Sequence, residues 1–179
     1  MRIISGIFKG KIITAPNQLP VRPTTDFAKT GIFNILMNYF DFEEISVLDL
    51  FCGTGNISFE FGSRGSSNIV AVDENVHCVK FASETFRKLD LQKAKTVRAD
   101  VFRFLEKNDS TYDIIFADPP YELVTTDKIP DIVMEKKLLN EGGWLIVEHQ
   151  AKRKLQSIVQ PDEIRKYGNC AFSIFKGMK

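Results

Sequence analysis

The feature that most constrains the fold is a regular alternation of short apolar runs with longer stretches of helical spacing. The apolar, often β-branched runs expected to form buried strands are 46–51, 68–73, 95–99, 112–118 and 143–148. The stretches expected to form helices between them are 53–64, 75–89, 101–106 and 129–139. Alternating strands and helices indicate an α/β fold with a largely parallel sheet and helices on both faces.

The two ends of the chain depart from this alternation. Near the start, the runs 2–5 and 11–14 predict a β-hairpin, and the prolines of 16–23 predict a linker. Near the end, the runs 163–167 and 171–176 predict an antiparallel hairpin. With 179 residues, we expect one domain, in which residues 1–23 extend a core of residues 24–179.

One further helix is expected between the linker and the first core strand. Thr24 or Thr25 can cap it, and it extends to about residue 39. The apolar positions near helical spacing, expected to face the core, are Phe27, Ile32, Phe33, Leu36 and Met37.

Composition and cysteine spacing exclude several protein classes. The chain is 44% apolar and 26% charged, which is typical of a globular protein. No apolar run is long enough to span a membrane, and the start of the chain lacks the pattern of a signal peptide. Cys52, Cys78 and Cys170 are widely spaced, so neither a disulfide framework nor a metal site is expected. We therefore expect a cytoplasmic protein without a metal. We also expect a monomer, although these features do not bear on oligomeric state.

The charges are distributed unevenly. Residues 1–30 carry five basic side chains and one acidic side chain, and residues 150–179 carry seven and two. The ends are therefore +4 and +5, and the middle is −8, in a chain whose net charge is +1. This pattern suggests a polyanion-facing surface built from the termini, with ordinary scatter of surface charge as the alternative.

The first core strand leads into a glycine turn of the kind that binds a cofactor. Residues 47–55 read Val-Leu-Asp-Leu-Phe-Cys-Gly-Thr-Gly, and the glycines let the backbone approach a ligand at a helix start. The segment is not a dinucleotide-binding fingerprint, because Ser58 occupies the position of the third glycine. Asp49 would suit a ligand's ammonium group better than a pyrophosphate.

Acidic residues also follow the next two strands. Asp73 is about 20 residues beyond the turn, as a ribose-binding acid would be. Asp100 follows the third strand, where an adenine edge would lie. Each acid alone could be a helix N-cap. Together with Asp49, they describe S-adenosylmethionine better than NAD or ATP.

The fourth strand ends in Asp118-Pro119-Pro120-Tyr121. A carboxylate can accept hydrogen bonds from an exocyclic amine, locked prolines fix a nearby carbonyl, and a tyrosine ring can stack on a base. The segment therefore suits methyl transfer to the amino nitrogen of a nucleobase. The alternative is a strand end followed by a polyproline turn with a surface tyrosine.

Three further segments are typical of one family when they occur together with the glycine turn and Asp118–Tyr121: Arg2-Ile-Ile-Ser-Gly, Arg22-Pro-Thr-Thr-Asp26 and Phe33-Asn34. Over roughly residues 1–149, the chain resembles the bacterial 16S rRNA guanine-N2 methyltransferases of the RsmD type. The resemblance implies a Rossmann-like class I methyltransferase fold with a seven-stranded sheet, a final antiparallel hairpin and an N-terminal hairpin near the RNA. It implies that the target is the N2 amine of a guanine, guanine 966 in the usual rRNA numbering. The partner would be 16S rRNA or the assembling small ribosomal subunit.

The resemblance also places the site residues. Those expected to hold the guanine are Asp118, Pro119, Pro120 and Tyr121. Those expected to hold S-adenosylmethionine are Asp49, Phe51, Cys52, Gly53, Thr54, Gly55, Asp73, Glu74, Asp100 and Val101.

Candidate RNA contacts are basic residues near the start of the chain, with weaker ones near the end. The candidates near the start are Arg2, Lys9, Lys11, Arg22 and Lys29. The weaker candidates are Lys152, Arg153 and Lys154. A solvated face is the alternative for the lysines, and a structural ion pair is the alternative for Arg22.

The chain departs from the family pattern after Asp26. The family usually continues with arginines and a glutamate, whereas Phe27, Ala28, Lys29 and Thr30 stand here. Two other functions remain open: an adenine-N6 methyltransferase acting on DNA or RNA, and a non-catalytic RNA-binding protein on the same scaffold. A length of 179 residues leaves no room for the inserted recognition domain that DNA adenine methyltransferases usually carry.

Overall fold

The computed structural model describes residues 1–16, 19 and 25–177. In this part of the chain, strands and helices alternate along one sheet, as expected. The helices are α1 (Asp26–Leu36), α2 (Asn56–Ser63), α3 (Val76–Lys88), α4 (Val101–Lys107), η1 (Val124–Asp127, a 3-10 helix) and α5 (Lys128–Glu135). The strands are β1 (Ser46–Leu50), β2 (Asn68–Asp73), β3 (Lys95–Arg98), β4 (Tyr112–Ala117), β5 (Leu139–Gln150), β6 (Glu163–Tyr167) and β7 (Cys170–Lys176).

The strands form a seven-stranded sheet in the order β3-β2-β1-β4-β5-β7-β6. The pairs from β3 to β5 are parallel, and β7 pairs antiparallel with both β5 and β6. The prediction of a mostly parallel sheet with a final antiparallel hairpin is therefore confirmed. Strand order reverses between β1 and β4, and ligands of such sheets bind at the carboxyl ends of the strands around this point.

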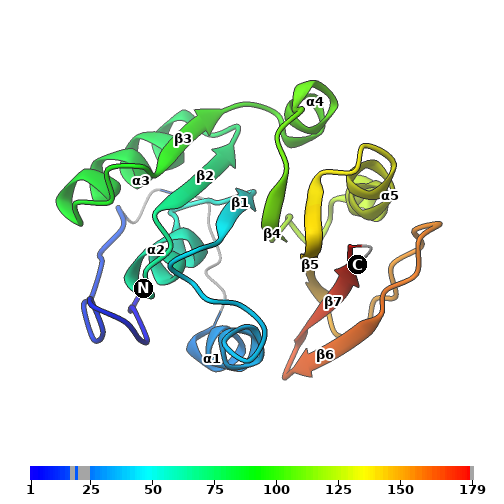
Figure 1. Cartoon of the computed structure of the whole chain (residues 1–179), viewed down its shortest axis with the longest axis horizontal. Helices are drawn as coiled ribbons and strands as arrows, with labels where there is room; N and C mark the ends of the chain where they lie inside the picture. The colour runs from blue at the N-terminus through cyan, green and yellow to red at the C-terminus, as the bar shows by residue number, and fades with distance from the viewer. Residues whose placement is uncertain (17–18, 20–24, 178–179) are drawn as a thin grey trace.

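Helices cover both faces of the sheet (Figure 1), and each face has its own apolar cluster. One cluster joins the sheet to α1, α2 and α3, and includes Phe33, Phe59 and Phe86. The other joins it to α4 and α5, and includes Leu105 and Val133. Burial of both sheet faces explains why the parallel strands are apolar along nearly their whole length.

Helix α1 is shorter and less buried than its sequence indicates. Thr25 caps it by accepting a hydrogen bond from the amide of Ala28 at 3.2 Å. Ile32, Phe33 and Leu36 face the core, but Phe27 and Met37 are exposed. The prediction that these two also face the core is wrong, because they lie at the ends of the helix, outside its buried stripe.

The N-terminal segment is mostly irregular rather than a regular β-hairpin. Its two runs pair antiparallel at a single bridge, Arg2 with Ile12. Backbone hydrogen bonds from Ile3 to Lys11 (3.0 Å) and from Ile13 to Met1 (2.9 Å) hold the two runs together. Side chains of α2 form hydrogen bonds with other backbone groups of this segment, as described below.

Candidate active site at the carboxyl ends of the strands

The glycine turn between β1 and α2 has a tight, left-handed backbone. Phe51, Gly53 and Gly55 have φ values of 59°, 51° and 83°. A β-carbon on Gly55 would lie 2.6 Å from the ring of Phe59, so glycine is required there. The amide of Cys52 donates to the carbonyl of Val72 at 3.0 Å, which fixes the turn against the end of β2.

Asp49 lies under this turn as a buried carboxylate, with only 1% of its surface exposed. Its Oδ2 accepts hydrogen bonds from the amide of Ser58 at 3.1 Å and from the Ser58 hydroxyl at 2.5 Å. Burial raises the pKa of Asp49 to about 7, although the Ser58 hydrogen bonds favour the charged form. Gly55 has no side chain to cap α2, so Asp49 supplies a capping hydrogen bond from the preceding strand.

Asp73, at the end of β2, connects directly to the glycine turn. Its Oδ2 accepts from the amide of Gly53 at 2.8 Å, and its Oδ1 accepts from the amide of Asn75 at 2.8 Å. The carboxylate is half-buried, and Glu74 beside it is exposed. The structure therefore brings Asp73 together with the turn as one hydrogen-bonded unit.

Asp100 lies farther along the same edge of the sheet and caps a helix. Its Oδ1 accepts from the amide of Arg103 at 2.9 Å, at the start of α4. Val101 is buried beneath it, and the ring of Phe102 lies edge-on to Phe51 with centroids 6.4 Å apart. An apolar surface thus stands between Asp100 and the glycine turn.

Asp118 follows β4 and lies beside the end of β1. Its amide donates to the carbonyl of Leu50 at 3.3 Å, immediately before the glycine turn. Pro119 is buried and Pro120 is exposed. The structure therefore places the Asp-Pro-Pro-Tyr segment next to the turn, although the two are more than sixty residues apart in sequence.

The segment that follows Asp118 is held by residues from β5 and the loop after it. The hydroxyl of Tyr121 donates to Oε1 of Glu148 at 3.4 Å. The Arg153 guanidinium donates to the carbonyls of Tyr121 (3.4 Å) and Leu123 (3.3 Å), and lies 3.2 Å from Oδ1 of Asp127. Arg153 therefore holds this segment in the fold, and its role as a phosphate contact stays a prediction.

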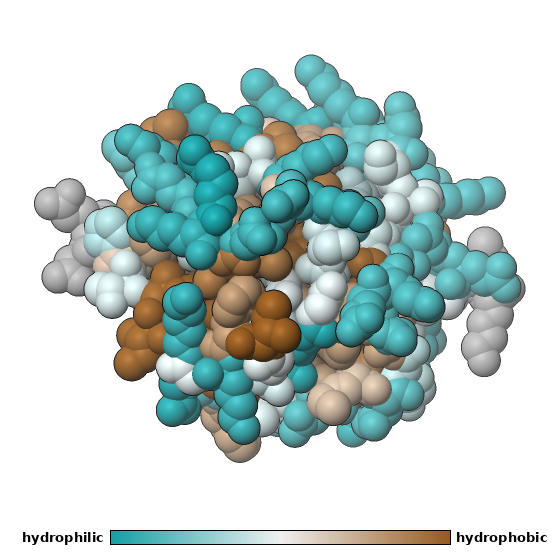
Figure 2. Space-filling view, turned by 60° about the vertical axis from the view of Figure 1, so that its left-hand side comes forward, coloured by the Kyte–Doolittle hydropathy of each residue, from teal (hydrophilic) through white to brown (hydrophobic). Residues whose placement is uncertain are grey.

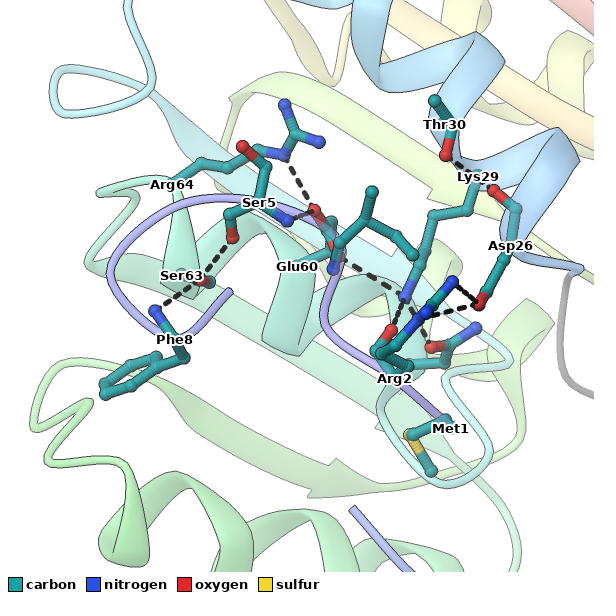
Figure 3. Close-up of polar contacts among 12 residues, drawn as sticks. Met1, Arg2, Ser5, Phe8, Asp26, Lys29, Thr30, Glu60, Ser63 and Arg64 are labelled. Atoms are coloured by element: carbon teal, nitrogen blue, oxygen red, sulfur yellow. Dashed lines mark hydrogen bonds and ion pairs between the residues drawn. The ribbon is translucent and has the colours of Figure 1, made fainter. Parts of the chain in front are cut away.

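The expected role of Lys29 as an RNA contact is wrong. It is fully buried, with 0% exposure, so it cannot contact RNA from this position. Its ammonium donates to the Arg2 carbonyl at 2.7 Å and to Oδ1 of Asn56 at 2.9 Å, and lies 3.3 Å from the Glu60 carboxylate (Figure 3). Burial lowers the pKa of Lys29, and Glu60 opposes that shift.

Glu60 anchors the N-terminal segment to α2, which the sequence pattern did not reveal. Its carboxylate accepts from the amides of Ile4 (2.8 Å) and Ser5 (3.1 Å), and pairs with Arg64 at 2.9 Å (Figure 3). Ser63, one turn later, donates to the Ser5 carbonyl at 2.5 Å. The signal in the sequence is a glutamate between two phenylalanines, with a serine three residues after it.

The other basic candidates lie at the surface, except where the structure does not describe them. Arg2 is exposed and pairs with Asp26 at 2.9 Å. Lys9 and Lys11 are exposed, and Arg22 falls outside the described residues. Figure 2 shows one face of the molecule, where hydrophilic side chains cover much of the surface and hydrophobic ones reach it between them.

Comparison with known proteins identifies the family. A family model described as "Conserved hypothetical protein 95" matches residues 1–176. YlbH of Bacillus subtilis is 34% identical over 163 residues, which cover 89% of this chain and 88% of that protein. Ribosomal RNA small subunit methyltransferase D of Haemophilus influenzae is 28% identical over 164 residues, covering 87% of this chain and 81% of that protein. The chain belongs to the RsmD-type family of rRNA methyltransferases.

Solved structures show the same fold as this RsmD-type chain. The Escherichia coli protein yhhF superposes with a TM-score of 0.88 at 19% identity, covering 100% of this chain and 98% of that chain. The class I methyltransferase fold expected from the sequence is thereby confirmed. In the described residues, no helix is long and apolar enough to cross a membrane, and no His, Cys, Asp and Glu side chains gather in a group that could hold a metal.

Proposed function

We propose that this chain transfers a methyl group from S-adenosylmethionine to the exocyclic N2 amine of a guanine in small-subunit rRNA, guanine 966 in the usual numbering. The observation that carries this proposal is the hydrogen bond between Asp118 and Leu50, which sets the base-binding segment beside the glycine turn. A cofactor on the turn and a base held by Asp118 would then meet at the β1–β4 junction. The RsmD-type family supports rRNA as the substrate.

The residues around the turn fit S-adenosylmethionine. Asp49 is a buried carboxylate with a raised pKa, so the positive charge of a nearby ammonium group would stabilise its ionised form. Each oxygen of Asp73 accepts one backbone amide and has a second lone-pair direction for a ribose hydroxyl. The Phe51 and Phe102 rings provide an apolar surface near Asp100 for a purine.

S-adenosylmethionine, when bound, supplies a methyl group on a positively charged sulfur, so the transfer needs no metal. The difficulty lies with the amine, whose lone pair is delocalised into the guanine ring. In this proposal the Asp118 carboxylate and the Pro119 carbonyl each accept one hydrogen bond from the amine, which directs the nitrogen lone pair away from the ring plane. Once the nitrogen carries the methyl group it is positively charged and releases one of its protons, and the sulfur leaves as a neutral thioether. Such alignment can lower a barrier by about 7–11 kcal/mol.

Tyr121 would stack on the base once it leaves the RNA. Unstacking costs a few kcal/mol, and a single-stranded loop avoids most of this cost. Stacking on an aromatic side chain offsets it by about 1–3 kcal/mol. The chain would act as a monomer on 16S rRNA or the assembling subunit, in the cytoplasm.

Methyl transfer with labelled S-adenosylmethionine tests the proposal. The acceptors are small ribosomal subunits from a strain that lacks the gene and, in a separate reaction, the naked rRNA of those subunits. After the reaction, nucleoside analysis identifies the methylated nucleoside, and mapping locates the labelled position. We expect N2-methylguanosine at one position. Label in N6-methyladenosine would contradict the proposal and indicate an adenine methyltransferase. Absence of label in both acceptors would contradict it and indicate a non-catalytic RNA-binding protein.

A further inference from the structure

Glu148 stands next to Asp118 on the neighbouring strand. The parallel β4–β5 pairing ends at Ala117 with Val147, so Asp118 and Glu148 occupy the next positions on the two strands. Backbones of paired strands lie about 4.8 Å apart. Phe116 and Ile146, two residues earlier, belong to the same core cluster, so alternation of side chains directs Asp118 and Glu148 to the same face of the sheet.

Contacts with β7 support this arrangement. Cys170 pairs with Gln150 at the start of β7. The pKa of the Cys170 thiol is raised to about 11, first by burial and then by the nearby charges of Glu148 and Asp118. Both carboxylates therefore lie within electrostatic range of one thiol, at the edge of the sheet that carries the glycine turn.

Glu148 is buried, with 4% of its surface exposed, and it takes part in the proposed base site through Tyr121. A carboxylate has about four lone-pair directions, so holding the Tyr121 hydroxyl is compatible with accepting a donor from a bound base. A carboxylate in such a dry site discriminates between bases, because a base that directs a donor at it is attracted and a base that directs a lone pair at it is repelled.

Guanine and adenine differ at the atom beside the reacting edge. Guanine presents the N1–H donor next to its N2 amine, whereas adenine presents an N1 lone pair next to its N6 amine. We infer that Glu148 selects guanine by accepting a hydrogen bond from N1–H while Asp118 accepts one from the N2 amine. This inference rests on the proposed function and assigns base selection to Glu148, outside the Asp-Pro-Pro-Tyr segment.

Substitution of the target guanine by 2-aminopurine tests this role. This base retains the 2-amino group but has an N1 lone pair in place of N1–H. The probe is small-subunit rRNA carrying 2-aminopurine at the position mapped above, assembled into particles. For the wild-type protein we expect kcat/KM to fall by about ten- to a hundredfold relative to guanine. For Glu148→Gln, whose amide can donate to the N1 lone pair, we expect that preference to shrink at least tenfold.

Tyr121→Phe is the matched control. It removes the hydroxyl that Glu148 holds but keeps the carboxylate, so both bases should lose activity alike and the guanine preference should persist. If Glu148 only orients Tyr121, Glu148→Gln will behave in the same way, and that result would overturn the inference. Binding of S-adenosylmethionine and the melting temperature confirm that each variant is folded.

The outcomes separate this inference from the proposed function. Methylation of adenine, or of no base, by the wild-type protein would overturn both. Guanine methylation with an unchanged base preference in Glu148→Gln would overturn the role of Glu148 alone.

Discussion

Asp49 is a buried acid whose ionisation is controlled mainly by its removal from water. Its pKa rises from 3.8 to about 7, and the hydrogen bonds from Ser58 only partly oppose the shift. The folded protein therefore binds a proton at this site between about pH 4 and pH 7 that the unfolded chain releases. The contribution of Asp49 to stability is present at low pH and is lost as the pH rises through 7.

We expect Asp49→Asn to remove this pH dependence. Asparagine can still accept the Ser58 hydrogen bonds without a buried charge. Relative to the variant, the wild-type protein without cofactor should lose on the order of 2–4 kcal/mol of unfolding free energy between pH 5 and pH 8. Urea unfolding across this range measures the difference, and parallel curves for the two proteins would contradict it.

In the proposed function, Asp118 holds the base rather than the cofactor. Its hydrogen bond to Leu50, at the end of β1, is made through its backbone amide, which a substitution of the side chain leaves in place. We expect Asp118→Ala to lower turnover by about a hundred- to ten-thousandfold and to leave the affinity for S-adenosylmethionine nearly unchanged. Calorimetric binding beside a methyl-transfer assay checks this, and an equal loss of both would show that Asp118 also holds the cofactor.

At the scale of elements, α2 joins the glycine turn to the N-terminal segment. Its first residue, Asn56, accepts from Lys29, and its Glu60 binds the amides of Ile4 and Ser5. The Glu60 side chain is fully buried, so its charge depends on Lys29 and Arg64 for compensation.

We expect Glu60→Ala to destabilise the protein by about 3–5 kcal/mol, because it leaves Lys29 without its buried counter-charge. Protection of the Ile4 and Ser5 amides from hydrogen exchange should fall more than that of the β1 amides. Glu106→Ala, a change of the same type at an exposed position of α4, should stay within about 0.5 kcal/mol of the wild type. Equal exchange at Ile4 and β1 in Glu60→Ala would refute the anchoring role.

At the scale of the whole molecule, the basic residues that the structure describes at the two chain ends divide into two groups. Arg2, Lys29, Arg153, Arg165 and Lys176 form ion pairs with acids of the fold. Lys9, Lys11, Lys152, Lys154 and Lys166 are exposed, and no ion pair is found for them among the described residues. The second group is the better candidate for phosphate contacts.

Lys9 and Lys11 lie on the N-terminal segment, where the backbone next to Lys9 binds Ser63 at the far end of α2. A helix of this length spans about 12 Å, so these lysines would touch RNA beyond the target nucleotide. We expect the double variant Lys9→Ala, Lys11→Ala to weaken RNA binding and to reduce the slope of log affinity against log salt by roughly 1.5.

The matched control is Lys93→Ala, Lys107→Ala, which removes two exposed lysines that precede β3 and β4, outside the N-terminal segment. Filter binding at several salt concentrations measures both pairs. Equal effects of the two pairs would indicate attraction by overall charge only, without a contact surface on the N-terminal segment.

Local pattern was sufficient for the strands, the glycine turn and the position of Asp118 at a strand end, because alternation of apolar residues and the backbone needs of glycine are properties of short segments. Packing between segments that are distant in sequence determines which polar residues are buried and which of them lie side by side. The sequence predicts that Lys29 is a surface cation on a helix, yet in the fold it is buried and its ammonium group contacts Glu60 and Asn56. In the sequence, Glu148 is only the last residue of an expected strand. The β4–β5 register, which ends at Ala117 with Val147, brings it next to Asp118. Burial and register depend on contacts across tens of residues, which only the tertiary structure specifies.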